Sequence, residues 1–330
     1  MEPPGRQSVD GEARSCPVPD LIRDARSGHP TRRAGIPAKA RNRLARAARI
    51  RQTGGMTRSI LITGCSSGIG HDAAHGLFRA GWRVFATCRD EGDCARLRDE
   101  GLESFALDYA DAASIRAALD EALSRTGGTL DALFNNGAFG CPGAVEDLPT
   151  DALREIFETN LFGYHELTRL VIPVMRAQGH GRIVNCSSVL GLVPLHWRGA
   201  YVATKYALEG LTDVLRLEMA DTAIKVILIE PGPITSKIRV NSIPHFERWV
   251  YWQESPRRAQ YEATLLKRLY EKRGPDRFEL PASAVTAKLI RALETNNPAP
   301  RYFVTTPTYL MNIARRILPT RALDALIRRG

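Results

Sequence analysis

Residues 59–70 read Ser-Ile-Leu-Ile-Thr-Gly-Cys-Ser-Ser-Gly-Ile-Gly, a short apolar run followed at once by a glycine-rich turn. The run predicts a buried strand, and the apolar spacing over residues 73–80 predicts a helix after the turn. Glycines let such a turn approach a pyrophosphate closely, and the helix offers free N–H groups to the phosphates. The stretch therefore predicts a nucleotide-binding turn made of Gly64, Ser66, Ser67, Gly68, Ile69 and Gly70.

The same residues also fit the motif of a different class of enzyme. Residues 64–68 match Gly-x-Ser-x-Gly, the nucleophile turn of α/β-hydrolases, in which Ser66 would attack the substrate. That turn belongs in the middle of a sheet, with an oxyanion-hole loop upstream of it. Here it follows the first recognisable strand, so the hydrolase interpretation is the weaker alternative.

Strand-like and helix-like segments alternate along the rest of the chain. Short apolar runs occupy residues 59–63, 83–87, 103–108, 131–135, 182–187, 225–229 and 301–305. Helical patterns lie between them, for example at residues 73–80, 113–123, 151–175 and 200–219. This alternation predicts an α/β protein with a doubly wound Rossmann fold, a parallel sheet of about seven strands and helices on both faces. Function is then expected in the turns beyond the carboxyl ends of the strands.

The charge of the chain is concentrated in its first part. The net charge of +10 includes twelve Lys and Arg against five Asp and Glu in residues 1–55, so residues 56–330 are close to neutral. We expect residues 1–55 to be a basic, disordered extension or the result of a misplaced start. A transit peptide, or an arm that contacts nucleic acid or anionic lipid, is the alternative. Residues 56–330 are expected to form a single domain in which 236–330 hold the substrate lobe and C-terminal helices.

The composition bears on the cellular compartment in which the protein is expected. No run approaches the about 18 apolar residues that span a bilayer. The six cysteines include no Cys-x-x-Cys pair, which favours free thiols in a reducing compartment, and we expect a cytoplasmic protein. No metal site is expected.

Tyr201 and Lys205 lie four residues apart in a helical pattern, so their side chains would share one helical face. A free tyrosine has a pKa of about 10 and exchanges protons poorly at neutral pH. A neighbouring ammonium stabilises the phenolate and lowers that pKa, which suits the tyrosine to give a proton to a carbonyl or take one from an alcohol. Such a pair is common on exposed helices, so its meaning depends on its surroundings.

Several polar residues lie at the ends of the predicted strands or between them. Asn135-Asn136-Gly137-Ala138 ends the fourth strand, Asn160 follows it, and Ser188 precedes Tyr201 by thirteen residues. Pro231-Gly232-Pro233-Ile234-Thr235 ends the sixth strand. With the glycine-rich turn and the Tyr-x-x-x-Lys pair, these motifs resemble the short-chain dehydrogenase/reductase family over residues 59–237.

The resemblance implies a role for each motif. Tyr201 would be the general acid/base, Ser188 would bind the substrate oxygen, and Asn160 would hold a proton-relay water. Lys205 would bind the nicotinamide ribose and lower the tyrosine pKa. Thr235 would bind the carboxamide, and further cofactor contacts are implied for Asp108, Asn135, Asn136, Gly137, Pro231, Gly232 and Ile234.

Two choices within these motifs rest on the family pattern. The family usually has Asn-Asn-Ala-Gly where this chain has Gly137-Ala138. Both orders keep small residues near the adenine ribose, so we expect the contact to survive. Ser188 is preferred over Ser187 because of the family's spacing to the tyrosine.

The end of the second strand bears on which dinucleotide is used. An NAD enzyme of this fold usually has Asp or Glu there, bonding the ribose 2′-hydroxyl. This chain has Cys88 followed by Arg89, which can pair with a 2′-phosphate. Asp90 and Glu91 follow and weaken the inference. NADP(H) is therefore favoured over NAD(H).

The substrate lobe is rich in aromatic residues. Trp249 lies in a cluster of four aromatics within residues 246–252, and Leu192 and Trp197 lie between Ser188 and Tyr201. These could form an apolar pocket for a steroid, retinoid or long-chain carbonyl compound, or they could pack a lid or an interface. Overall the chain looks most like the branch that contains 17β-hydroxysteroid and retinol dehydrogenases.

Expectations about partners follow from the resemblance and from the C-terminus. The helix at residues 200–219 commonly forms the interface in this family, so a homodimer or homotetramer is expected. Residues 309–329 are basic and amphipathic, and could contact a membrane surface or close the substrate pocket. No nucleic-acid partner is expected. A catalytically idle NADP-binding sensor is the alternative to the enzyme, although the intact Ser188, Tyr201 and Lys205 argue against it.

Overall fold

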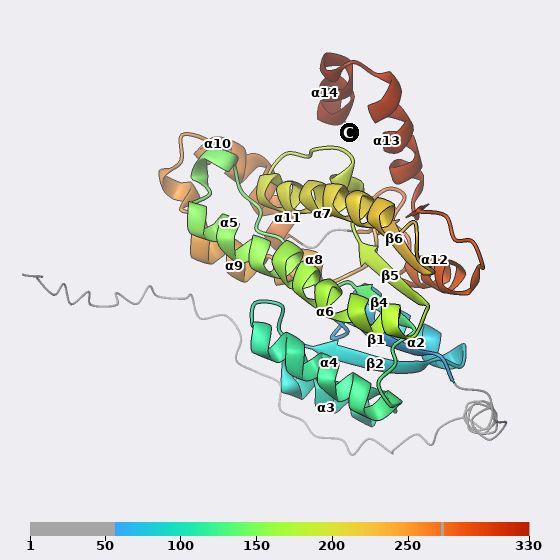
Figure 1. Cartoon of the computed structure of the whole chain (residues 1–330). Coiled ribbons are helices and arrows are strands. Elements are labelled where there is room, and N and C mark those ends of the chain that lie inside the picture. The colour runs from blue at the N-terminus through green and yellow to red at the C-terminus, as the bar shows by residue number, and fades with distance from the viewer. Residues whose placement is uncertain (1–56, 272–273, 330) are drawn as a thin grey trace, which may run out of the picture. The chain divides into compact units, whose positions relative to one another are not determined.

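The centre of the computed structural model is a sheet of seven parallel strands in the order β3-β2-β1-β4-β5-β6-β7 (Figure 1). The chain moves outward from β1 to one edge and then returns to β4 to build the other half, so β1 and β4 mark the point where the strand order reverses. The strands are β1 Ser59–Ile62, β2 Arg83–Cys88, β3 Glu103–Ala106, β4 Ala132–Asn135, β5 Gly181–Cys186, β6 Ile224–Glu230 and β7 Arg301–Phe303. The Rossmann-type prediction is confirmed.

The structure describes residues 57–271 and 274–329, and the expectations for residues 1–55 lie outside this part of the chain. Within it, no helix is both long and apolar enough to cross a membrane. The helices are α2 Gly68–Arg79, α3 Glu91–Asp99, α4 Ala112–Thr126, α5 Thr150–Phe157, α6 Gly163–Ala177, α7 Gly199–Glu218, α8 Ile238–Asn241, α9 Ile243–Trp249, α10 Arg258–Gln260, α11 Leu266–Tyr270, α12 Ser283–Glu294, α13 Thr306–Ile317 and α14 Thr320–Arg329.

Helices cover both faces of the sheet. Successive side chains of a strand point to opposite faces, so each strand contributes to both buried layers. Ile60 and Ile62 pack with α2, α3 and α12, whereas Leu61 packs with α4, α6 and α7 (Figure 1). This explains why the strands read as continuous apolar runs rather than as alternating ones. Sandwiching the sheet in this way leaves the carboxyl ends of the strands as the edge where polar side chains can gather.

The helix expected over residues 151–175 is interrupted. A π-helical turn, Glu158–Phe162, separates α5 from α6 and holds Asn160 at its centre. A π-turn adds one residue to the helical path and turns a side chain that would otherwise point elsewhere, and such turns are frequent at functional sites. The first helix also begins earlier than expected, at Gly68, because the end of the glycine-rich turn is already helical.

A separate small core lies beyond β6. Phe246 of α9, Val250 and Tyr261 form it with Leu265, Leu269 and Ala144, and Trp197 packs against it. The hydroxyl of Tyr261 accepts a hydrogen bond from the backbone N–H of Ala144 (2.7 Å) and donates to the Asp147 carboxylate (2.7 Å). The segment after β6 is thereby fastened to the loop that follows β4.

Candidate active site

The glycine-rich turn is pressed against the end of β4. Gly64 has φ +68°, and a Cβ placed on it would lie 2.5 Å from the Cα of Gly137. A Cβ on Gly70 would lie 2.2 Å from the carbonyl oxygen of Gly64. The side-chain amide of Asn136 fixes the turn by donating to the carbonyls of Thr63 (3.1 Å) and Gly64 (3.3 Å). Only glycine fits at Gly64 and Gly70, and their backbone stays bare for a ligand.

The neighbouring Asn135 lies in the core and not at the turn. It is fully buried, its amide donates to Thr168 (3.1 Å) and Asn185 (2.9 Å), and its oxygen accepts from Tyr109 (2.7 Å). The structure therefore uses Asn135 to join β4 to β5 rather than to face a ligand. The ring of the same Tyr109 limits the room at Gly137, because a Cβ on Gly137 would lie 3.2 Å from it.

One cavity of about 750 Å³ lies over the carboxyl ends of the strands. The sequence-predicted residues that line it are Gly64, Ser66, Ser67, Gly68, Ile69, Asn136, Gly137, Ser188, Tyr201, Lys205, Pro231, Gly232, Ile234 and Thr235. It is not lined by Gly70, Arg89, Asp108, Asn135, Asn160, Leu192, Trp197 or Trp249. The fold thus brings the glycine-rich turn and the Tyr-x-x-x-Lys helix, which lie far apart in sequence, to one space.

Three polar side chains meet at the floor of this cavity. Tyr201 and Lys205 lie one turn apart on α7, and the Lys205 ammonium lies 5.6 Å from the centre of the Tyr201 ring. The ammonium donates to the carbonyl of Cys186 at the end of β5 (2.8 Å). The Ser188 hydroxyl accepts from the backbone N–H of Leu190 (3.1 Å), so its own proton is free to be donated into the cavity. The hydroxyl oxygen of Ser187, in contrast, is buried and has no hydrogen-bond partner among the described residues.

The protonation states of these groups follow from burial. Burial raises the pKa of Tyr201 and Cys186 adds to this, whereas the Ser188 hydroxyl and the Arg198 charge lower it. Burial also lowers the pKa of Lys205 to about 8. In this state burial dominates, and the expected lowering of the tyrosine pKa by Lys205 is not found. Tyr201 therefore holds its proton at neutral pH.

Asn160 lies beneath the site rather than in it. It is fully buried, its side-chain oxygen accepts from the N–H of Phe139 (3.1 Å), and its amide donates to the carbonyl of Phe139 (2.9 Å) and to Thr204 (3.3 Å). Its side chain therefore anchors the loop after β4 to α7. Its role in a water relay stays a prediction.

Thr235 lines the cavity, and its polar groups already have partners there. Its hydroxyl donates to the Glu279 carboxylate (2.7 Å), and its backbone N–H donates to the carbonyl of Leu280 (3.0 Å). These bonds close the segment after β6 over the cavity. A carboxamide would therefore have to compete with Glu279 for the Thr235 hydroxyl proton.

The region after β2 contains the charges that bear on the dinucleotide. Cys88 is buried, Arg89 is exposed, and the Asp90 carboxylate accepts from the backbone N–H groups of Gly92 (2.8 Å) and Asp93 (3.2 Å). Asp90 is thus the N-cap of α3, a structural use for an acidic residue in this position.

The proposed substrate residues need correction. Leu192 is a buried core residue, and the Trp249 indole donates to Glu155 (2.8 Å) while its ring packs in the lobe core. Trp249 is held by the lobe after β6, and neither residue lines the cavity over the strand ends. Trp197 lines an adjoining cavity of about 450 Å³ and has φ +65°, a conformation that is strained for a bulky residue.

Arginines near Tyr201 were missed by sequence reasoning. Arg198 and Arg268 line both cavities, and burial lowers the pKa of Arg198 to about 10. Arg198 could have been noticed because it directly precedes the helix that contains Tyr201. Arg268 lies far along the chain in α11, and no local pattern marks it.

The comparisons with known proteins agree with this geometry. The family model for the short chain dehydrogenase matches residues 58–245. An uncharacterized oxidoreductase of Escherichia coli strain K12, YbbO, is 37% identical over 272 residues, which cover 82% of this chain and 94% of that protein. Retinol dehydrogenase 16 of Mus musculus is 32% identical over 283 residues, covering 81% and 87%.

Solved structures give the same result. A short-chain dehydrogenase/reductase from Burkholderia phymatum in complex with NAD aligns with a TM-score of 0.65 and 26% identity, covering 83% of this chain and 96% of that one. An actinorhodin polyketide ketoreductase with NADPH aligns with a TM-score of 0.61 and 26% identity, covering 75% and 95%. These matches overturn the hydrolase interpretation of Ser66. The chain belongs to the short-chain dehydrogenase family and is an oxidoreductase.

Proposed function

We propose that this oxidoreductase uses NADP(H) to interconvert a carbonyl and an alcohol on a bulky, largely apolar substrate, with Tyr201 as the general acid/base. One observation carries the proposal. The glycine-rich turn, Ser188, Tyr201 and Lys205 all line a single cavity at the carboxyl edge of the sheet. In open parallel sheets this edge is where ligands bind.

The residues present fit a dinucleotide. The backbone at Gly64 and Gly70 is tight enough to exclude any side chain, and α2 begins at Gly68 without a side-chain cap on its first N–H groups. Lys205 and the segment from Pro231 to Thr235 would hold the nicotinamide half at the other end of the cavity. When bound, the nicotinamide supplies or accepts the hydride.

The chain's own residues donate or accept the proton that accompanies the hydride transfer. In the reductive direction the Tyr201 hydroxyl gives its proton to the substrate oxygen, and the Ser188 hydroxyl donates a hydrogen bond to the same oxygen. Ser188 is oriented for this by Leu190, whose N–H occupies a lone pair of the serine oxygen. Lys205 is held by the carbonyl of Cys186, which leaves two of its N–H donors for a ribose or for the phenolate that remains.

NADP(H) is proposed over NAD(H) from the end of β2. No carboxylate occupies the Cys88 position, Arg89 is exposed, and the nearest acid, Asp90, already caps α3. An arginine there pairs with a 2′-phosphate, whereas the 2′-hydroxyl of NAD offers it no charge. Arg89→Ala should weaken NADPH binding much more than NADH binding. Arg154→Ala, an exposed arginine on α5, is the control, and equal losses for both cofactors would contradict the assignment.

The substrate class is supported by the cavity walls and by the relatives. Val189, Leu190, Leu195 and Ile238 give the cavity an apolar part. Several similar proteins are named retinol dehydrogenases. Arg198 and Arg268 at the same cavity favour, as a second candidate, a bulky carbonyl compound that also carries an anionic group. A panel that pairs neutral aldehydes and ketones with anionic analogues separates the two.

The decisive experiment follows NADPH oxidation with this panel. Tyr201→Phe should lower turnover by about 100-fold or more, because general acid catalysis contributes about 10²–10⁴-fold. Tyr206→Phe is the matched control, since Tyr206 is on the same helix but donates to the carbonyl of Leu192 (2.9 Å). Turnover that survives in Tyr201→Phe would overturn the assignment. Tight NADPH binding without turnover by either protein would favour the sensor.

Assembly and membrane contact are proposed from exposed apolar residues. On α7, Val214 and Leu217 are 52% and 70% exposed, which supports a homodimer or homotetramer formed along this helix. On α13, Ile313 and Ile317 are 54% and 71% exposed beside basic residues, which supports peripheral contact with an anionic membrane. Light scattering tests the first proposal and flotation with anionic vesicles tests the second.

A further inference from the structure

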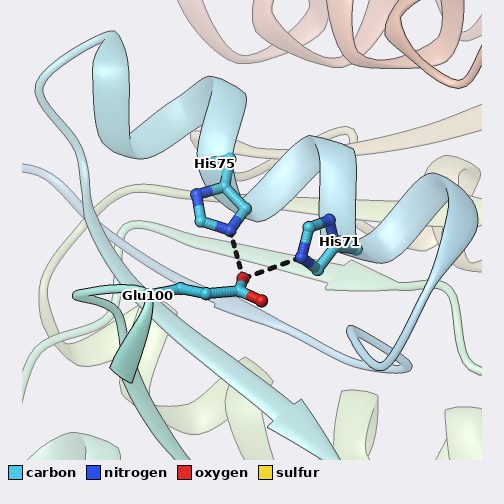
Figure 2. Close-up of side chains that lie close together, drawn as sticks. All are labelled: His71, His75 and Glu100. Atoms are coloured by element: carbon cyan, nitrogen blue, oxygen red, sulfur yellow. Dashed lines mark hydrogen bonds and ion pairs between the residues drawn. The ribbon is translucent and has the colours of Figure 1, made fainter. Parts of the chain in front are cut away.

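Outside the cavity, two histidines and a glutamate meet between α2 and α3. The Nε2 atoms of His71 and His75 lie 2.8 Å and 2.7 Å from the same carboxylate oxygen, Oε2 of Glu100 (Figure 2). We propose that His71, His75 and Glu100 form a binding site for Zn²⁺ that joins α2 to α3. No metal site is expected from the sequence motifs above, although the His-x-x-x-His spacing in a helix is a signal for one.

The positions of the three side chains suit one ion. His71 and His75 are four residues apart on α2, so their rings lie on one face with centres 4.6 Å apart. One ligand atom from each of the three residues lies within 4.8 Å of the others. Zinc bonds of about 2.0–2.2 Å in a tetrahedral arrangement require ligand atoms about 3.4 Å apart. Small side-chain rotations therefore replace the two hydrogen bonds by metal bonds.

The carboxylate is prepared for this role. Its Oε2 atom already faces the Nε2 atoms of both histidines. Its other oxygen, Oε1, faces the Arg96 guanidinium at 3.5 Å. Arg96 is itself held by Asp93 (2.7 Å) and by the carbonyl of Ser66 (2.7 Å). Glu100 is thus oriented from behind, and Oε2 is the oxygen directed at the histidines.

The ligand types select the kind of ion. Two imidazoles and one carboxylate form the ligand set of zinc sites that keep an open position for water. Calcium and magnesium prefer oxygen ligands alone, so they fit this set poorly. The side chains of His71, His75 and Glu100 are 33%, 22% and 30% exposed, which lets an ion enter from solvent and water complete its coordination.

The location gives the ion a positioning role. His71 directly follows Gly70 of the glycine-rich turn, and Arg96 joins Glu100 to the carbonyl of Ser66 in that turn. None of the three ligands lines the cavity, so the ion would not touch the reacting atoms. Zinc would instead tie the start of α2 to the end of α3.

The test uses the tag-free, metal-stripped full chain and Zn²⁺ itself. Calorimetric titration should show a site whose affinity falls at least about tenfold in His75→Ala and in Glu100→Gln, because even indirect partners of a metal site contribute about 10–100-fold. His165→Ala, an exposed histidine on α6, should bind as wild type. Cobalt added in place of zinc should give a visible absorption band that both variants lose.

The outcomes are decisive because Glu100→Gln keeps the size of the side chain and its reach to the histidines. The thermal midpoint of the wild type should rise with Zn²⁺, and that of Glu100→Gln should rise much less. No binding by the wild type, or binding unchanged in both variants, would overturn the proposal and leave the three residues as a hydrogen-bonded cluster.

Discussion

Arg301 is the only cation bonded to three carboxylates in the described part of the chain. It is the first residue of β7, and its guanidinium bonds to Glu209 and Asp213 of α7 and to Glu230 of β6, with 2.6 Å to Asp213. Glu230 is fully buried and the Glu209 side chain is 8% exposed. Burial raises the pKa of both glutamates, and that of Glu230 reaches about 8. The site therefore depends on one positive charge.

Arg301→Met should be strongly destabilising. Methionine fills much of the volume but leaves Glu209 and Glu230 buried without a cation, and breaking a buried ion pair costs about 3–5 kcal/mol. For a domain of this size each kcal/mol shifts the thermal midpoint by about 2–4 °C, so the expected loss is about 6–20 °C. Because Glu209 lies one turn beyond Lys205 on α7, activity should fall together with stability.

Thermal and urea unfolding followed by circular dichroism measure this effect. The matched control is Arg125→Met, whose ion pairs with Glu121 and Glu103 lie at the surface and should contribute only about 0.2–1 kcal/mol. Adding Glu209→Gln and Glu230→Gln to Arg301→Met should restore much of the loss, because no buried carboxyl group is then left without its cation. If Arg301→Met costs no more than the control, the reasoning about buried charge is wrong.

Three further outcomes are expected. Gly64→Ala should weaken cofactor binding well beyond Gly101→Ala, since both have positive φ but only Gly64 also lacks room for a Cβ. Equal cofactor dissociation constants for the two variants in binding titrations would contradict this. Because the folded-state pKa of Glu230 is about 8 and the unfolded value about 4.3, the unfolding free energy should fall as pH rises from about 5 to 8, and Glu230→Gln should flatten that slope in urea titrations. Asn160→Ala should cost about 2–4 kcal/mol of stability, because it strands both backbone groups of Phe139, and a variant as stable as wild type would remove the anchoring role.

Much of the fold could be predicted because it depends on local patterns. Runs of five or six residues predict the strands, which are three to seven residues long in the structure, and an apolar period of three to four predicts the helices. The exception is the interruption at Glu158–Phe162, which no local pattern marks. It exists because Asn160 must turn inward to reach Phe139, a contact between residues 21 apart.

The sequence by itself determined the family, the parallel sheet and many of the residues that line the cavity, because spacing and order carry that information. Only the tertiary structure decided what each polar side chain faces. It turned Asn135 into the core, engaged Thr235 with Glu279, made Asp90 a helix cap and brought His71 to Glu100. The physical reason is that hydrogen bonds and burial depend on distances across the fold, which the linear order of residues does not contain.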